Sequence, residues 1–544
     1  MSRTSTETET VSLQPLHPHP LHSSPLPSYQ PRPQSALFEQ TAPGIGVTLT
    51  TTLSNAAPSE RTSYPVLSSL RTVSIVITVA TATLIQSMLS GVLTIGLPRI
   101  AEDLGISESL LLWPASVSAL VSGCTLLLCG SISDVVGSRS MYLLGCLLLA
   151  LFTLACGFSQ NGTQLIVFRA ITGLSLAMCL PTAVSITTAS FPPGRVRNLA
   201  FAVLGAAQPI GFAIGLVLGG ILVDGIGWRY AYWIAPIIPA IAIAMALVSL
   251  RSDAMRGGKA ILQALAIEVD WVGALMAGAA MGLLSYVFAV VTTSTTSIKS
   301  PLNIVILVVA VACLPGFVFW EAYREKKSRS AMIPNSLWRN VHFSCICAAV
   351  FFGWAAFSAN QYFLTLYFQK VQQISATQAS LRFLPMVFSG AATNLGTGFV
   401  VHRVRADHLV VGTVLLTLAS PIIMALADRN ASYWTFSFPA VLLAPICADT
   451  LFTISNLVIT SVFPSKTHGL AGAVFNALAQ ISTSVGLAVA ALVSNGVSGG
   501  NLDVDGLEKG YRAAFWTVAA AQAAMLLITA VGLRGVGKVG LKRD

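Results

Sequence analysis

The chain has 544 residues, of which 54% are hydrophobic and 10% are charged. Soluble domains carry about 25% charged residues, so this composition excludes an ordinary soluble protein, and the high apolar content excludes collagen-like and wholly disordered chains. The net charge of +10 is typical of basic residues that hold cytoplasmic loops in place. We therefore expect a membrane protein with no nucleic-acid partner.

Residues 1–71 differ in composition from the rest of the chain. They hold ten of the 26 prolines, together with many Ser and Thr residues, and such a segment buries too little apolar surface to order itself. We expect a disordered cytoplasmic tail there. The expected parts after it are an N-terminal six-helix bundle, cytoplasmic linkers with an extra helix pair, a C-terminal six-helix bundle and a short cytoplasmic tail, over 72–250, 251–341, 342–534 and 535–544.

Fourteen apolar runs follow residue 71, and each is close to the ~20 residues that a membrane-spanning helix needs. Their approximate bounds are 72–97, 110–129, 141–158, 164–187, 199–223, 231–250, 271–291, 302–320, 343–362, 381–400, 409–427, 436–462, 470–493 and 513–533. The third and tenth runs are short, so thirteen spans is the alternative count. The expected fold is an all-α polytopic protein that contacts the lipid bilayer along its length.

The distribution of basic residues predicts the orientation. If the N-terminal tail is cytoplasmic, the inner loops and C-terminal tail hold 18 Lys and Arg residues and the outer loops hold 8. This bias predicts that both termini are cytoplasmic. The sequons that begin at Asn161 and Asn430 then fall outside, where they are candidate glycosylation sites.

A compact basic loop is expected at the inner end of the second run, over 130–139. Its glycines, Gly130 and Gly137, permit a tight turn, and Arg139 adds a cytoplasmic charge. Asp134 can accept N–H groups at a helix N-terminus, which would form a latch between the two halves that breaks when the inside opens. The alternative is that Asp134 only caps the third helix.

Arg169 lies four or five residues inside the fourth run. A guanidinium that faces lipid at the membrane centre costs at least ~2.5–3.5 kcal/mol, so Arg169 is expected to face the bundle interior. The alternative is that its side chain extends to the outer membrane surface.

The fifth run carries glycines at four-residue spacing. Such residues lie on one helix face and let another helix come very close. Gln208 and Pro209 precede them and would bend the helix and expose a polar group. We interpret the face as a seal against leak or as simple helix packing, and its glycines are Gly211, Gly215, Gly219 and Gly220.

Polar residues inside other runs are candidates for a transport pathway. Asp449 is the only acid deep inside an expected span, which makes it a candidate proton carrier. The alternative is a permanently hydrogen-bonded structural acid. The remaining pathway candidates are Gln86, Asn360, Gln361 and Asn456.

Signals for enzymatic chemistry are poor. The sequence has no G-x-x-x-x-G-K-S/T phosphate-binding loop and no H-E-x-x-H zinc motif. The G-x-S-x-G match over 496–500 follows a helical run and lacks the strand-to-helix elbow that this motif requires. All nine cysteines fall within apolar runs and are interpreted as small buried hydrophobes. We expect no enzyme activity, no cofactor and no metal site.

In its motifs and their order, the sequence resembles the fourteen-spanning drug/proton antiporter branch of the major facilitator superfamily found in fungi. The resemblance covers about 72–534 and looks strongest toward the aminotriazole and boron resistance subgroup. It implies two six-helix bundles with an extra helix pair at the periphery. The residues that carry it are Gly130, Asp134, Gly137 and Arg139 in the inner loop, Arg169 and Gly173 in the fourth helix, Gly211, Gly215, Gly219 and Gly220 in the antiporter motif, and Asp270, Trp271 and Gly273 at the extra pair.

Three positions depart from the family pattern. Leu216 replaces the antiporter-motif proline, which weakens the inference of export. Leu89 occupies the slot of an acid that the branch usually has before Gly96-Leu97-Pro98, so the usual proton-coupling acid is absent. Val135 replaces the middle arginine of the loop motif.

The resemblance implies a secondary transporter that works by alternating access. The expected activity is export of a xenobiotic or secondary metabolite in exchange for protons, with Arg169 orienting polar relays, Asp449 carrying the proton and Asp134 latching the inner gate. One alternative is an uncoupled facilitator or importer of a small polar solute such as ammonium or borate, which Leu89 and Leu216 favour. Another is a transport-inactive membrane sensor. The expected location is the plasma membrane, with the vacuolar membrane as the alternative, and no obligate protein partner is expected.

Overall fold

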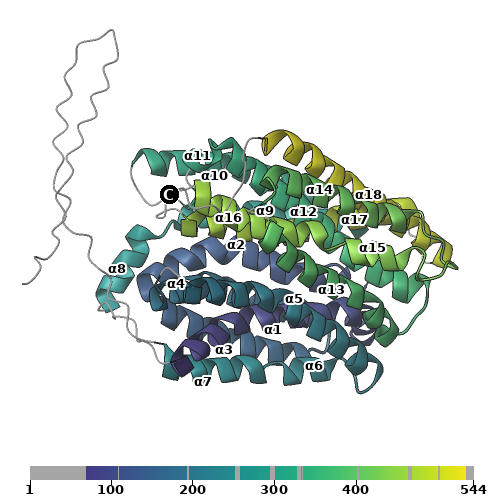
Figure 1. Cartoon of the computed structure of the whole chain (residues 1–544), viewed down its shortest axis with the longest axis horizontal. Helices are drawn as coiled ribbons and strands as arrows, with labels where there is room; N and C mark the ends of the chain where they lie inside the picture. The colour runs from purple at the N-terminus through teal and green to yellow at the C-terminus, as the bar shows by residue number, and fades with distance from the viewer. Residues whose placement is uncertain are drawn as a thin grey trace, which may run out of the picture. The chain divides into compact units, whose positions relative to one another are not determined.

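The computed structural model describes residues 69–534, except 108–109, 193–194, 251–257, 294–299, 328–331, 334, 401–402, 463–467, 500 and 502. The tails expected at 1–71 and 535–544 lie outside the described residues, apart from the last three residues of the first. Every regular element in the described part is a helix (Figure 1). The expectation of an all-α fold is therefore confirmed.

The helices form two bundles with a short set of helices between them. The N-terminal bundle contains α1 (Ser69–Asp103), α2 (Trp113–Val136), α3 (Ser138–Gly157), α4 (Gly162–Ser190), α5 (Arg195–Asp224), α6 (Arg229–Ile234) and α7 (Ile237–Ser249). The intervening helices are α8 (Gly258–Glu268), α9 (Trp271–Thr293), α10 (Pro301–Lys326) and α11 (Asn335–Trp338). The C-terminal bundle contains α12 (Val341–Leu366), the π-helical turn η3 (Tyr367–Val371), α13 (Ala376–Val400), α14 (Ala406–Ala425), α15 (Ser437–Leu443), α16 (Ile446–Val462), α17 (His468–Ser498) and α18 (Val504–Gly532).

Several of these helices have a side-chain cap at the N-terminal end, where the apolar run starts. The Asn161 carboxamide oxygen accepts the Gln164 N–H at 2.9 Å before α4, and Asp503 accepts the Gly506 N–H at 2.9 Å before α18. Each cap satisfies a donor that the first helical turn leaves without a backbone partner.

In the described residues, twelve helical segments are long and apolar enough to cross a membrane, or thirteen if α8 and α9 count as one span with a 58° bend. The fourteen spans expected from the sequence are therefore not all reproduced. The tenth expected run is the helix α13, but α13 is not among the segments that meet this length and composition standard.

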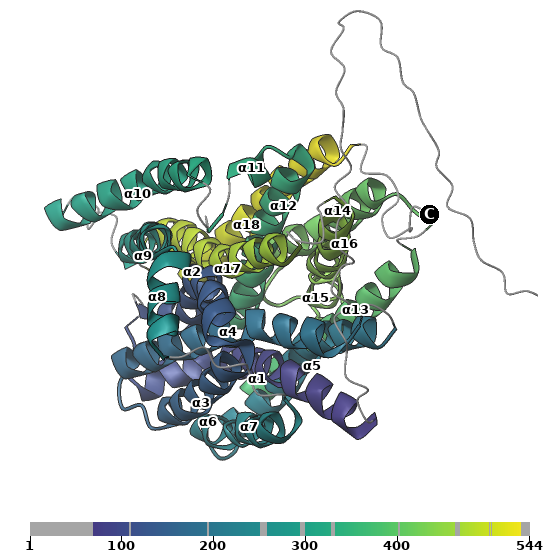
Figure 2. The same ribbon diagram turned by 90° about the vertical axis from the view of Figure 1, so that its left-hand side faces the viewer.

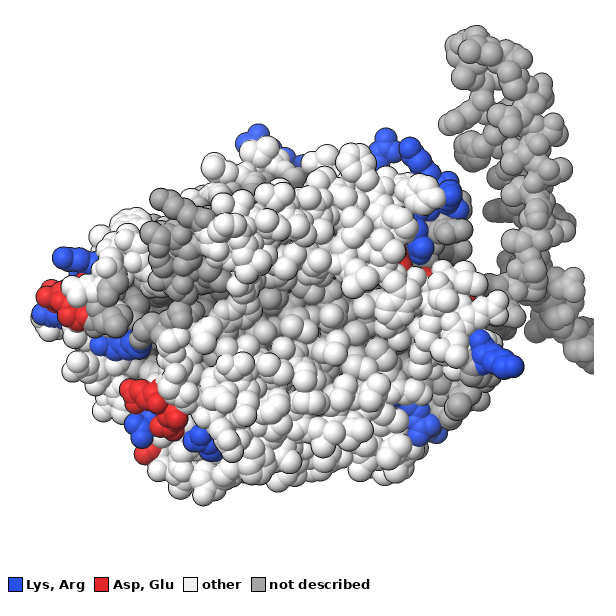
Figure 3. All heavy atoms as spheres, turned by 180° about the vertical axis from the view of Figure 1, so that it is seen from behind, with Lys and Arg blue, Asp and Glu red and all other residues white. Residues whose placement is uncertain are grey.

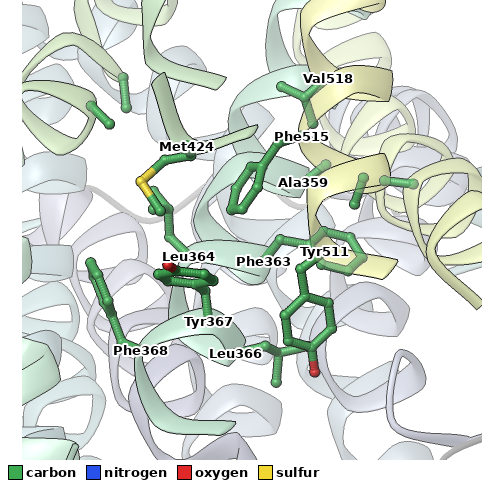
Figure 4. Close-up of a cluster of buried hydrophobic side chains, with 14 of the residues drawn as sticks. Ala359, Phe363, Leu364, Leu366, Tyr367, Phe368, Met424, Tyr511, Phe515 and Val518 are labelled. Carbon is green, nitrogen blue, oxygen red and sulfur yellow. The ribbon is translucent and has the colours of Figure 1, made fainter. Parts of the chain in front are cut away.

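Each bundle is built around its own apolar core. The N-terminal core joins α1, α3, α4 and the α6–α7 pair. In the C-terminal bundle, aromatic side chains of α12, η3 and α18 pack edge to face, as Phe363 does on Tyr511 and Tyr367 on Phe515 (Figure 4). This second core also includes Ile95 and Leu216 from the N-terminal bundle, so it continues across the line where the two bundles meet.

The extra helix pair packs on the outside of the two bundles. Helix α9 packs against α2 of one bundle and α17 of the other, while α10 packs on α9 (Figure 2). Asp270 caps α9 by accepting the Gly273 N–H at 2.9 Å. Its carboxylate also accepts the Trp320 indole N–H at 2.9 Å and lies 3.6 Å from the Arg324 guanidinium. One face of α9 is exposed, as Leu275 at 71% shows, so the pair lies at the periphery of the bundles, along the line where α2 and α17 meet.

Charged side chains are absent from the middle of the face shown in Figure 3, among the residues described there, and lie around its margins. Large apolar side chains are exposed over the helices, as Leu275 at 71% and Phe388 at 72% illustrate. An apolar zone with charges at its margins is the surface that a lipid bilayer requires.

Candidate functional site: the interface between the two bundles

Helices α1 and α5 touch backbone to backbone along the glycine face of α5. A Cβ atom on Gly211 would lie 2.2 Å from the Leu84 carbonyl oxygen, and one on Gly215 would lie 2.0 Å from that of Met88. A Cβ on Gly219 would lie 2.9 Å from the Cα of Val92. No side chain fits at these positions, so the glycine face brings α5 onto α1 without a gap.

Two of the three departures from the family pattern, Leu89 and Leu216, lie at this same contact. Leu89 is 1% exposed and belongs to the N-terminal core. Leu216 is fully buried, and its backbone nitrogen would lie 2.8 Å from a Cβ on Gly91 of α1. The slot that would hold an acid is therefore packed with hydrocarbon.

Arg169 faces the interior of the N-terminal bundle, as expected. It is 2% exposed, and its Nε donates to the Pro114 carbonyl oxygen at 3.0 Å. Cys156 and Tyr232 lie beside the guanidinium. One turn later, a Cβ on Gly173 would lie 2.2 Å from the Ser118 carbonyl oxygen of α2. The α4 motif thus fastens α4 to α2 within one bundle, and Arg169 does not lie on the surface that faces the other bundle.

Gln86 extends this polar contact to α1. Its Nε2 donates to the Ser118 hydroxyl at 2.9 Å. Its Oε1 is buried and has no hydrogen-bond partner in the described part of the chain. A buried acceptor without a donor is costly, so this oxygen is a place where a bound water or a substrate donor would be stabilised.

Asp449 lies on α16 beside α13, and the Asn394 side chain of α13 lies near it. A Cβ on Gly390 of α13 would lie 2.7 Å from the Asp449 Oδ2, so the absence of a side chain there makes room for the carboxylate. Asp449 is half-buried, and no ion pair to it exists among the described residues. It is an acid without a countercharge in that part of the chain.

The opposite wall near Asp449 comes from α5. One turn after Asp449, the Phe452 ring lies 3.6 Å from the Cβ position of Gly205, and Gly205 is one turn before Gln208. Because residues three or four apart share a helix face, Gln208 and Asp449 each lie one turn from this contact between α5 and α16.

The other pathway candidates lie in different places. The Asn360 Nδ2 donates to the Ser420 hydroxyl at 3.1 Å, and Ser420 donates to the Ala440 carbonyl at 2.7 Å, so Asn360 faces the inside of the C-terminal bundle. Gln361 contacts the Met386 sulfur of α13 at 3.6 Å. The side chain of Asn456 lies outside the described residues.

The expected inner loop at 130–139 is almost entirely helical, so the prediction of a loop there is wrong. Helix α2 continues through Val136, and only Gly137 separates it from α3. Gly137 has φ of +107°, which explains the glycine. Gly130 packs against Pro181 of α4, and Arg139 donates to the Leu247 carbonyl of α7 at 3.0 Å.

Asp134 is exposed, and it makes neither a hydrogen bond nor an ion pair within the described residues. The alternative that it caps the third helix is wrong, because Gly137 occupies the cap position of α3 and no side chain bonds there. The contact between halves that was expected of Asp134 is not made in this conformation.

The two bundles meet along two seams. In the first, α2 packs on α17, where a Cβ on Gly123 would lie 3.0 Å from the Ala477 carbonyl oxygen. In the second, α5 lies beside α13 (Figure 2), and the C-terminal end of α5 makes polar contacts with the N-terminal end of α13. Asp224 accepts the backbone N–H groups of Ala376 at 3.3 Å and Thr377 at 2.7 Å.

Two further hydrogen bonds close the same end. The Thr377 hydroxyl donates to the Gly220 carbonyl oxygen at 2.9 Å. The Gln369 Nε2, on the π-helical turn η3, donates to the Ile95 carbonyl oxygen of α1 at 2.8 Å. A pocket of about 760 Å³ lies beside these contacts, and Arg99, Asp103 and Lys370 are among the residues that line it. The bundles are therefore joined at this end, which is the end opposite to the one that carries Asp134.

A family model described as Major Facilitator Superfamily matches residues 79–487. The chain belongs to the major facilitator superfamily. The members of this superfamily are transporters rather than enzymes, and this chain is accordingly a multi-pass membrane transporter of small molecules.

Similar superfamily members come mostly from fungi. MFS-type transporter 1 of Pyricularia oryzae is 43% identical over 537 residues, which cover 89% of this chain and 87% of the relative. The low affinity ammonium transporter of Saccharomyces cerevisiae is 26% identical, over 74% of this chain and 77% of the relative. The aminotriazole resistance protein of the same yeast is 24% identical, over 74% and 73%. More distant relatives are named as efflux pumps.

Solved structures of the superfamily share the fold. A bacterial homologue of the human lysosomal transporter Spinster superposes with a TM-score of 0.60 at 14% identity, covering 86% of this chain and 99% of that chain. At this identity the likeness concerns the fold alone.

Several residues at the interface were not found from the sequence of this superfamily member. Asp224 directly follows the fifth apolar run, which is typical of an ordinary loop residue. Gln369 follows the expected end of the ninth run and was therefore also outside the expected spans. Asn394 lies within the tenth run, and the sequence does not show that this residue lies near Asp449 on another helix. Each owes its role to a partner on a different helix.

The two sequons lie at exposed helix ends. Asn161 is exposed and caps α4, and Asn430 is exposed in the turn between α14 and α15. Whether either is glycosylated stays a prediction.

Proposed function

We propose that this superfamily member is a proton-coupled exporter of a xenobiotic or secondary metabolite that works by alternating access. It would have fourteen spans, with α13 counted among them, and both termini in the cytoplasm of a fungal plasma membrane. In this orientation the joined end of the bundles is the outer end, and the conformation described here is closed to the outside.

The observation that carries the proposal is the environment of Asp449. A half-buried acid without a countercharge among the described residues, near Asn394 and one turn from the contact between α16 and α5, suits a group that takes up and releases a proton. Gln208 opposite, with Gln86 deeper in the N-terminal bundle, offers neutral hydrogen-bonding groups to a polar substrate. Relatives named as a resistance protein and as efflux pumps support export.

The test uses the purified protein in liposomes with an imposed pH gradient. Radiolabelled aminotriazole serves as the probe, because a relative is named for resistance to it. Transport should proceed against the aminotriazole gradient when protons flow the other way and should stop when a protonophore removes the pH gradient. Transport that only equilibrates aminotriazole, with or without the pH gradient, would reject proton coupling.

A second candidate is an uncoupled facilitator of a small polar solute. Two observations favour it: Leu89 fills the slot of the missing acid inside an apolar core, and a relative is named as an ammonium transporter. The same liposomes with an ammonium gradient distinguish the candidates. A facilitator would carry ammonium down its gradient at a rate that does not change when Asp449 is replaced.

A further inference from the structure

The geometry points to Asp224 as the positioning residue that holds the outer gate closed, by binding the first turn of α13 in the opposite bundle. The inference concerns the equilibrium between conformations and rests on the proposed function only in calling this end the outer one. Neither a bound substrate nor proton coupling is needed for it.

The first reason is the chemistry of the contact. The first turn of a helix leaves backbone N–H groups without intrahelical acceptors and carries a partial positive charge. The Asp224 carboxylate accepts two of these groups, from Ala376 at 3.3 Å and from Thr377 at 2.7 Å. A carboxylate is a stronger acceptor than a neutral group, and here it comes from a helix of the other bundle.

The second reason is the close approach that Gly220 allows, one turn before Asp224. A Cβ on Gly220 would lie 2.5 Å from the Ser380 hydroxyl and 3.0 Å from the Thr377 Cα, both on α13. Gly220 therefore differs from Gly211 and Gly215, whose missing side chains face α1. The last glycine of the antiporter motif serves the seam between bundles, and it sets the register in which Thr377 reaches the Gly220 carbonyl oxygen at 2.9 Å.

The third reason is how the N-terminal end of α13 is held within its own bundle. The Arg382 guanidinium stacks over the rings of Phe368 and Tyr433, with its carbon 5.6 and 5.2 Å from the ring centres. The Tyr433 hydroxyl donates to the Arg382 carbonyl oxygen at 2.8 Å. Burial raises the pKa of Tyr433 to about 12, so it keeps this donor proton at physiological pH. The end of α13 is thus a rigid target for Asp224.

Asp224 itself is exposed, unlike the buried apolar contacts of the α2–α17 seam. Water can replace its hydrogen bonds when the helices part, so the contact can break and re-form during a transport cycle. Separation of either seam exposes apolar surface, around Gly123 in the α2–α17 seam and around Leu216 and Ala379 in the α5–α13 seam. The α5–α13 seam differs in also having charged and polar contacts that can hold it closed and release it.

The test measures access to the seam from outside. Ser380 is 2% exposed and lies against Gly220, so Ser380→Cys is a reporter that the closed gate protects from a membrane-impermeant maleimide. In the full-length protein in intact cells, Asp224→Ala should speed labelling of this reporter at least about tenfold, as expected when hydrogen bonds to a charged acceptor are lost. Asp224→Asn should give an intermediate rate, because an amide oxygen still accepts an N–H group but carries no charge.

The matched control is Glu102→Ala. Glu102 lines the same pocket and pairs with Arg99 on its own helix at 3.3 Å, so the labelling rate should stay within about twofold of the parent. Each variant is also labelled without the Ser380→Cys reporter, which corrects for the native cysteines. If the reporter is labelled at the same rate in the parent and in the Asp224→Ala variant, the inference is overturned.

A second measurement covers the case in which Asp224→Ala fails to fold. Spin labels at Ile226 and Gln378, both exposed on opposite sides of the seam, report its width in the Asp224→Asn variant, which keeps the size of the side chain and loses its charge. A longer population in the distance distribution supports the gate, and an unchanged distribution rejects it. If the Ser380→Cys reporter is labelled only from the cytoplasmic side, Asp224 still holds a gate, but the proposed orientation is wrong. If the seam opens in the Asp224 variants but the protein transports no aminotriazole, only the proposed function is rejected.

Discussion

The fourth membrane-spanning segment of each bundle, α4 in one and α15–α16 in the other, carries one charged residue, and the two are held in opposite ways. Arg169 on α4 is buried within its own bundle and donates to a carbonyl oxygen of α2. Asp449 on α16 is half-buried, lies near the neutral Asn394 side chain and is one turn from Phe452, which contacts α5 of the other bundle. A charge satisfied inside one bundle stabilises that bundle, whereas an acid without a countercharge at the interface can gain and lose a proton as the bundles move.

The pairs α1–α5 and α12–α17 make a second comparison, since each joins the first and fifth long helices of a bundle. Helix α5 meets α1 through Gly211, Gly215 and Gly219, with backbone against backbone. Helix α17 meets α12 through Gly486 and through a hydroxyl pair, Ser358 and Thr483, at 3.0 Å. The N-terminal pair is sealed by the shape of its backbones, and the C-terminal pair partly by polar groups.

The largest effect is expected from Asp449→Asn, which keeps the size of the side chain but cannot carry a proton. Accumulation of aminotriazole driven by a pH gradient in liposomes should fall to the level of protein-free liposomes, while thermal stability stays close to the parent. Asp428→Asn is the control, because Asp428 lies in an exposed turn and accepts the Asn430 N–H at 3.1 Å. Normal gradient-driven accumulation by the Asp449 variant would make this acid structural, like Arg169.

Gly215→Ala should destabilise the protein next most strongly. Its Cβ would lie 2.0 Å from the Met88 carbonyl oxygen, so α1 and α5 must move apart, at a cost of about 1–3 kcal/mol or more. The midpoint of thermal unfolding in detergent measures this. Gly412→Ala in α14 is the matched control, since nothing lies within 4 Å of its Cβ position, and it should stabilise by about 0.5–1 kcal/mol. Equal effects at the two sites would show that α1 and α5 are not in backbone contact.

Arg169→Lys should lower the free energy of unfolding by about 1.5–3 kcal/mol, because a lysine does not place an N–H group where the Arg169 Nε meets the Pro114 carbonyl. Unfolding midpoints and transport assays on the same preparation are the measurement. The ratio of transport with and without a pH gradient should be unchanged. If the ratio of transport with and without a pH gradient falls while the free energy of unfolding is unchanged, Arg169 takes part in proton coupling and the contrast with Asp449 disappears.

The smallest effect concerns the hydroxyl pair of the C-terminal bundle. A double-mutant cycle of Ser358→Ala and Thr483→Ala should give a coupling energy of about 0.6 kcal/mol, the average found for hydrogen bonds between membrane helices. Unfolding midpoints of the two single variants and the double variant supply it. A coupling energy of zero would mean that α12 and α17 are joined by packing alone, as α1 and α5 are.

Local patterns predicted a large part of the fold and of the candidate site. The apolar runs predicted the helices, because a helix that crosses a bilayer must be apolar over its length, and the spacing of glycines predicted a face of close contact on α5. The motif around Gly137 marked a turn, but it could not show that α2 stays helical through Val136, since that depends on packing against α4. The role expected of Asp134 is likewise not visible in this conformation, where Asp134 makes no hydrogen bond or ion pair within the described residues.

The sequence by itself determined that this chain crosses the membrane many times and buries few charges, because both properties follow from composition and short-range periodicity, and its motifs indicated a transporter by resemblance. Only the tertiary structure decided that Asn360 faces its own bundle, that Phe452, one turn from Asp449, meets α5, and that Asp224 reaches the first turn of α13, 153 residues away along the chain. The physical reason is that a hydrogen bond between helices depends on how the two helices are rotated and shifted relative to each other. The sequence around a side chain does not show which backbone group of another helix will pack against it.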